Sequence, residues 1–199
     1  MKKINTYINE KLKISKTTYS LFPKTYEELD KMITNEINKN GNECSLNHID
    51  VSKITKMDAL FFESEFNGDI SQWDVSNVKS MVNMFDGSSY TGIHNGIADW
   101  DVSNVENMSF MFASSEFDAN IDNWDVRNVW NMEHMFRWCA FNQDISSWDV
   151  SNVETMESMF EHSDFRKDIS NWQINSKCIT SNMFFDCKIQ QNRKPKGVK

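Results

Sequence analysis

The chain has 199 residues, of which 39% are hydrophobic and 25% are charged, with a formal net charge of −8. This length suits one domain with short appendages, and no run approaches the roughly 18 consecutive apolar residues that a membrane span requires. The charge is uneven: residues 1–48 carry +2, residues 49–172 carry −15 and residues 173–199 carry +5. The acidic middle would repel phosphate backbones, which argues against direct nucleic-acid binding and favours a protein partner with a basic surface.

The first segment, residues 1–48, begins with two lysines that no apolar core follows. We therefore predict no secretory signal and expect the chain to be cytoplasmic. Within this segment residues 25–40 predict an amphipathic helix that caps the first unit of the array described next. Thr25 is the candidate N-cap, Glu28 completes a capping box, and Gly41 ends the helix.

Residues 49–186 predict a repeat array. Trp73, Trp100, Trp124, Trp148 and Trp172 stand 27, 24, 24 and 24 residues apart, and a fixed period in this range is typical of a solenoid. Positions are counted here from this tryptophan as position 0, whose place Ile49 takes in the first unit. Apolar residues recur at positions 2, 5, 8, 11 and 12, and position 12 is always phenylalanine: Phe61, Phe85, Phe112, Phe136, Phe160 and Phe184.

Two apolar periods divide each unit. Positions 0 and 2 alternate with polar residues, which predicts a short strand, whereas the spacing of positions 5, 8, 11 and 12 predicts a short helix. The fold class predicted is an α/β repeat solenoid of about five to six strand–short helix units. The asparagine at position 4, such as Asn128, is either the N-cap of that helix or an amide that bonds the backbone of the neighbouring unit. The last residues, 187–199, are basic and predict a disordered tail.

The repeated phrase of Trp148-Asp-Val-Ser-Asn-Val153 followed by Met156, Met159 and Phe160 resembles the BspA-type repeat of bacterial surface proteins, a family also known as a mycoplasmal lipoprotein-type repeat of unknown function. The resemblance covers roughly residues 49–186. It implies a leucine-rich-repeat-like solenoid and, for secreted members, adhesion or binding of a host protein.

An aspartate follows the tryptophan in successive units, which would place carboxylates opposite one another in the stack and destabilise it unless something offsets their repulsion. The row could accept cationic side chains of a partner or bind Ca²⁺ weakly, or each carboxylate could bond the serine or backbone of its own turn. The candidate partner-binding residues of this row are Asp74, Asp101, Asp125 and Asp149.

The fourth unit departs most from the repeat, because Arg127 replaces serine, Trp130 occupies a polar position, and Arg137 and Trp138 follow the phenylalanine. Arginine and tryptophan dominate interface hot spots, which makes these four residues candidates for partner binding. The alternative is that Trp130 and Trp138 only cover gaps on the outside of the array.

The sequence offers no catalytic constellation: it has no nucleophile–base pair and no glycine-rich phosphate loop, and its four cysteines and four histidines lack metal-ligand spacing. We therefore predict no enzymatic activity, no metal and no cofactor, with the thiols reduced. The predicted function is a non-enzymatic protein-binding scaffold with an acidic surface. One alternative is a nucleic-acid mimic, encoded by a phage or mobile element, that inhibits a host protein; another is a cell-surface adhesin, if the chain is exported.

Overall fold

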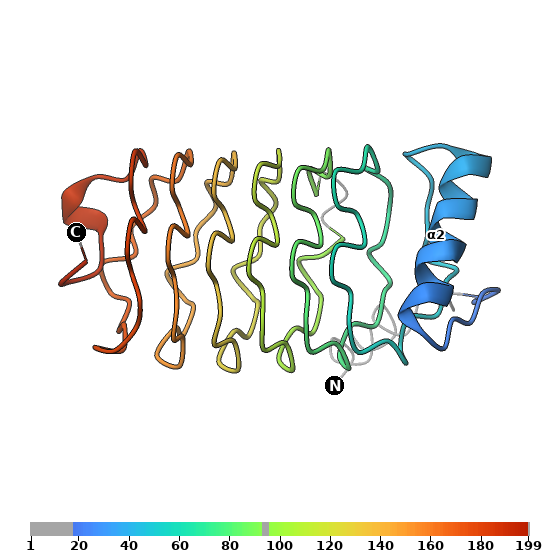
Figure 1. Cartoon of the computed structure of the whole chain (residues 1–199), viewed down its shortest axis with the longest axis horizontal. Coiled ribbons are helices and arrows are strands. Elements are labelled where there is room, and N and C mark those ends of the chain that lie inside the picture. Colours follow the sequence, from blue (N-terminus) through green and yellow to red (C-terminus); the bar gives the residue numbers. More distant parts are fainter. Residues whose placement is uncertain (1–17, 93–95, 199) are drawn as a thin grey trace, which may run out of the picture.

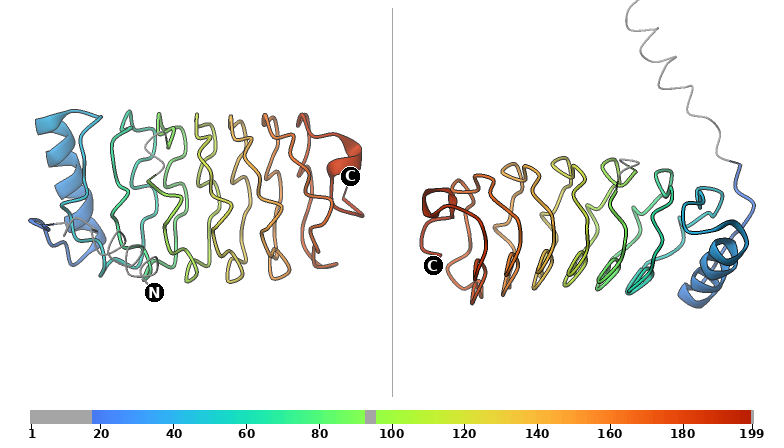
Figure 2. Two further views of the ribbon diagram at one scale, coloured as in Figure 1. Left: turned by 180° about the vertical axis from the view of Figure 1, so that it is seen from behind. Right: turned by 90° about the horizontal axis from the view of Figure 1, so that it is seen from above.

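The computed structural model describes residues 18–92 and 96–198. Within these residues the regular elements are helix α2 (Tyr26–Asn40) and the short 3-10 helix η1 (Gln191–Arg193). The rest of the described chain forms successive coils that stack along one axis, with α2 at one end and η1 at the other (Figure 1). Seen from above, each coil follows the last as a separate loop (Figure 2).

The predicted α/β solenoid of strand–short helix units is wrong. Among residues 18–92 and 96–198 no strand forms, and the only sheet-like contacts are isolated parallel bridges. Six residues at position 7 form one column of such bridges: Lys56, Ser80, Asn107, Asn131, Thr155 and Ile179. Trp124 and Val126, in the predicted strand, instead sit between two turns, closed by the Trp124 N–H to Ile121 and the Val129 N–H to Val126 bonds.

The predicted short helix is replaced by a series of turns because two residues in each unit have left-handed backbone angles. In the fourth unit these are His134 (φ 56°) and Trp138 (φ 55°), at positions 10 and 14. The same two positions are left-handed in all six units. A right-handed helix cannot pass through a residue with positive φ, so the apolar spacing of three and four here reflects consecutive turns, such as Met132–Met135, closed by a 3.3 Å bond.

Backbone hydrogen bonds between units take the place of the missing helical bonds. In the fourth unit the N–H groups of Met132, His134, Phe136 and Trp138 donate to carbonyls of the fifth unit at 2.9–3.0 Å. Each of the five junctions between units repeats this pattern: the N–H groups of positions 8, 10, 12 and 14 donate to the carbonyls of positions 7, 9, 11 and 13 of the next unit. All these N–H groups therefore point toward the C-terminal end of the stack.

The core consists of columns of like side chains, one from each unit. The position-12 phenylalanines stack on one another with ring centroids 5.4–5.7 Å apart. A second column, formed by Phe66, Tyr90, Phe117, Phe141 and Phe165, has centroids 6.0–6.4 Å apart. These rings are buried, and so is the column of methionines at position 8 from Met57 to Met156. Each unit thus covers its apolar side only against its neighbours.

Two side-chain bonds explain why tryptophan and asparagine recur. The indole Nε1 of each tryptophan at position 0 donates to a backbone carbonyl nearer the N-terminal end of the stack, as from Trp124 to Ile97 at 2.8 Å. The asparagine at position 4 donates its amide in the same way, as from Asn128 to Ser103 at 2.6 Å. Of the two roles considered for this asparagine, the structure shows the bond to the neighbouring backbone, since no helix follows it.

The two ends of the stack differ. At the N-terminal end, α2 packs Leu29 and Ile33 into the core, and the Thr25 hydroxyl accepts the Glu28 N–H at 3.2 Å. At the C-terminal end we expected disorder over 187–199, but residues 187–198 fold back on the last coils. The Ile169 N–H donates to the Arg193 carbonyl at 3.0 Å, and Val198 is buried. Apolar contacts thus anchor a tail whose composition is basic.

Candidate functional site

The aspartates of the predicted row accept hydrogen bonds from residues of their own turns. Oδ1 of Asp101 accepts the Ser103 N–H at 3.1 Å and the Ser103 hydroxyl at 2.6 Å. Asp74 and Asp149 make the same pair of bonds to the serine two residues later. Of the roles considered for the row, the structure shows the bond to the serine of the same turn. All three aspartates are nevertheless exposed, so their negative charge remains on the surface.

Arg127 forms a two-point ion pair with Asp125 where other units have serine. Its Nε lies 2.8 Å from Oδ1 of Asp125, and its Nη2 lies 2.6 Å from Oδ2. The hydrogen bond from Arg127 lowers the pKa of Asp125, and the one from the Ser151 hydroxyl lowers the pKa of Asp149. The arginine therefore offsets repulsion in the middle of the aspartate row.

Trp130 and Trp138, which the sequence suggested as one patch, lie at different positions of the unit. Trp130 is at position 6, where its backbone bonds Glu106 and Glu154 of the adjacent units, and its side chain is 42% exposed. Trp138 is at position 14, in the turn series, and is 55% exposed. In the described part of the chain no hydrogen bond, ion pair or ring contact joins Trp130 to Arg137 or Trp138.

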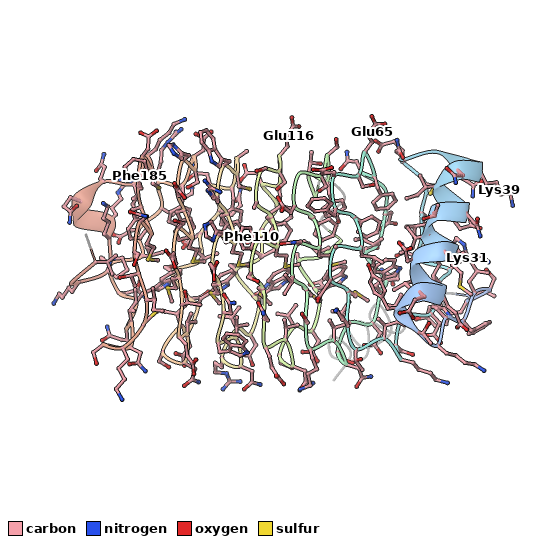
Figure 3. The ribbon with its side chains drawn as sticks, in the orientation of Figure 1. Lys31, Lys39, Glu65, Phe110, Glu116 and Phe185 are labelled. Atoms are coloured by element: carbon pink, nitrogen blue, oxygen red, sulfur yellow. The ribbon has the colours of Figure 1, made fainter. Side chains whose placement is uncertain are left out.

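Trp138 belongs instead to a cluster that crosses three units. Its ring stacks on His162 with centroids 4.0 Å apart and an interplanar angle of 19°, and His162 meets the edge of Phe185 at 5.4 Å. Nδ1 of His162 lies 2.9 Å from Oδ2 of Asp186. Trp138, His162 and Phe185 are called the aromatic cluster below. Phe185 is 57% exposed and lies beside the C-terminal end (Figure 3).

Arg137, in the fourth unit, forms an ion pair with Glu161 of the fifth unit. Its Nε lies 2.9 Å from Oε2 of Glu161, next to the aromatic cluster, which places both charges at its border. His162 and Phe185 were not among the residues singled out from the sequence. The sequence does carry a signal for this contact, since Trp138 and His162 share position 14 and stand one period apart.

The described residues contain no group of three or more His, Cys, Asp or Glu side chains placed to hold a metal ion. The four cysteines are free, and burial raises the pKa of the Cys139 thiol to about 11. No helix in the described part is long and apolar enough to cross a membrane.

Comparison with known proteins places the repeat in a family. Neither the curated proteins nor the solved structures yield a match. The family model described as "Mycoplasma protein of unknown function, DUF285" matches residues 27–112 and again residues 88–196, which together cover most of the chain. The match supports the mycoplasmal part of the resemblance noted in the sequence and does not specifically support the BspA-type leucine-rich-repeat assignment. The chain belongs to this mycoplasmal DUF285 family of unknown function.

Proposed function

We propose that this chain is a non-enzymatic protein-binding scaffold and that the aromatic cluster is its principal contact surface. The observation that carries the proposal is the exposure of Trp138 (55%) and Phe185 (57%) in one cluster. Large aromatic side chains in a stacked, ordered arrangement lose little conformational entropy on binding and supply most of the binding energy at interfaces.

The charges around the cluster favour a partner with basic groups. Glu161 and Asp186 border it, and residues 49–172 carry a net charge of −15. Charge at the border of an interface steers the approach of an oppositely charged partner and makes association sensitive to salt. The aromatic rings would then provide affinity, while the carboxylates would select a basic partner and speed its association.

The proposal can be tested by quantitative capture of proteins from extracts with the wild-type chain and with Trp138→Ala. Phe62→Ala is the matched control, because Phe62 is 46% exposed but lies in the first unit, away from the cluster. We expect a set of basic proteins that wild type and Phe62→Ala retain and Trp138→Ala loses, with weaker capture at high salt. Identical capture by all three proteins, with unchanged circular dichroism, would contradict the proposal.

The same experiment separates the scaffold from a nucleic-acid mimic. A mimic captures DNA- or RNA-binding proteins and is displaced by excess polyanion, since it occupies their phosphate-binding surface through charge alone. A scaffold that binds through the aromatic cluster depends on Trp138 and resists displacement by polyanion at moderate salt.

A further inference from the structure

The last unit of the stack has a row of backbone donors without acceptors. In every earlier unit the N–H groups at positions 8, 10, 12 and 14 donate to the next unit, as Met156 does to the Ile179 carbonyl at 2.8 Å. In the last unit the corresponding residues are Thr180, Asn182, Phe184 and Asp186. Within residues 18–92 and 96–198 none of their backbone N–H groups has an acceptor. These four N–H groups are called the donor edge below.

A pocket of about 750 Å³ lies over the donor edge. All four residues of the edge line it, together with exposed Ile179 and Phe185. Lys194 and Gly197 of the tail form another part of its wall. The Lys194 ammonium lies 5.1 Å from the centre of the Phe184 ring, so the tail covers the end of the phenylalanine column. Of the four edge residues, Asn182 and Asp186 are exposed, Thr180 is half-buried and Phe184 is buried.

The pocket lining itself holds one carboxylate, Asp186, and one ammonium, Lys194, whereas the terminal segment around it is basic. Residues 173–199 carry a net charge of +5, against −15 for residues 49–172. An occupant of the pocket would therefore be favoured if it carried carboxylates. The occupant must also present backbone carbonyl groups at alternate residues. Within the stack, each unit presents its carbonyls in this way to the N–H groups of the preceding unit.

A second intact copy of this chain fits the edge poorly. Two copies related by a two-fold axis would place donors against donors, which leaves the N–H groups unpaired. A head-to-tail contact would need the carbonyls of the first unit, at Lys56, Asp58, Leu60 and Phe62, and helix α2 lies at that end of the stack (Figures 1 and 2). The occupant is thus a separate segment and not another complete array.

We propose that the donor edge is a binding site for an acidic, repeat-like segment of a partner protein, which adds to the stack as a further unit. Carbonyls of the segment accept the four N–H groups, an apolar side chain contacts Ile179 and Phe185, and a carboxylate pairs with Lys194. This mode of recognition extends a backbone ladder at its free edge, as in strand addition to a sheet. The site shares Phe185 and Asp186 with the surface of the proposed scaffold function, but it does not include Trp138 or His162.

The chain itself supplies a probe. Residues 154–163 (Glu-Thr-Met-Glu-Ser-Met-Phe-Glu-His-Ser) contain three glutamates, and in the stack their carbonyls accept N–H groups of the fourth unit. We expect the fluorescently labelled, end-blocked peptide to bind the full chain with a dissociation constant below about 1 mM. Added peptide should slow hydrogen exchange at the four amides of the donor edge. The control peptide has lysine in place of each glutamate and should bind at least tenfold more weakly.

Substitutions in the full chain test whether the peptide binds at the donor edge. Thr180→Pro removes one donor that has no native partner and should weaken peptide binding about three- to tenfold, whereas Thr180→Ala keeps the N–H and should not. Lys194→Glu should weaken binding at least threefold, while Lys39→Glu, which makes the same charge change on α2, should leave it unchanged (Figure 3).

Three outcomes would overturn the proposal. The first is absence of binding at 1 mM peptide, and the second is binding that protects amides other than those of the donor edge. The third is slow exchange at these four amides before peptide is added, which would mean that the edge is already covered. None of these outcomes bears on capture through Trp138, so failure here is distinguishable from failure of the scaffold proposal.

Discussion

The indole hydrogen bond between units leads to a quantitative prediction for Trp124→Phe. Trp124 is 3% exposed, and its Nε1 donates to the Ile97 carbonyl at 2.8 Å. That carbonyl also accepts the Trp100 N–H at 3.2 Å, so the substitution does not leave it without a partner. The lost bond should therefore cost only its net contribution of about 0.5–1.5 kcal/mol. Replacing the indole by the smaller phenyl ring adds about 1–2 kcal/mol, for a total of about 1.5–3.5 kcal/mol.

The measurement is urea unfolding of the full chain, followed by circular dichroism, with the m-value required to stay constant. A second variant carries benzothienylalanine at residue 124, in which sulfur replaces the N–H at nearly the same volume. It should lose only the hydrogen-bond part, about 1 kcal/mol. If this isosteric variant were as stable as wild type while Trp124→Phe lost about 1.5–3.5 kcal/mol, the tryptophan would be selected by volume, and the argument from the hydrogen bond would fail.

Three further predictions concern the aspartate row and the thiols. Asp101→Asn retains the oxygen that accepts from Ser103 and should change the free energy of unfolding by less than about 0.5 kcal/mol, whereas Asp101→Ala should cost about 0.5–1.5 kcal/mol; equal urea midpoints for the two variants would refute this. Because the pKa values of Asp125 and Asp149 are lowered on folding, their contribution to stability should be present above about pH 4 and lost as the pH falls further. Urea midpoints between pH 6 and 3 should thus fall less steeply in a variant with both residues changed to asparagine, and parallel curves would contradict the linkage. Cys139, whose pKa burial raises to about 11, should resist alkylation at pH 8 while the three partly exposed cysteines react, as mass spectrometry can show; equal labelling would mean that the core opens easily.

The repeat and its core columns could be predicted from the sequence, but the backbone conformation could not. Phenylalanine at position 12 and methionine at position 8 recur too regularly to be surface residues, and both columns are buried. The turn series was mistaken for a helix because its buried positions have the same spacing of three and four. Its left-handed residues include Phe110 and Ser158, which do not signal positive φ. Gly87, Asn83 and Asn182 are of types that favour it, but they do not recur at these positions in every unit.

The candidate site was predicted only in part. Trp138 was identified as a departure from the repeat, but its partners were not, because a stacked fold joins residues one period apart and not neighbours in sequence. His162 and Phe185 lie 24 and 47 residues from it in the chain. Trp130 is near Trp138 in sequence, yet it is separated from it by the turn series of the same unit.

The N–H groups at positions 8, 10, 12 and 14 all point in one direction, so the two ends of the array differ. The C-terminal end presents N–H groups, and the N-terminal end, where α2 lies (Figure 1), presents carbonyls. If α2 were removed, the carbonyls of one copy would match the donor edge of another, and that contact could repeat without closing. The same stack would then grow as a filament from a single kind of subunit. Helix α2 would therefore act as a terminator that limits the length of the assembly, in addition to covering the core.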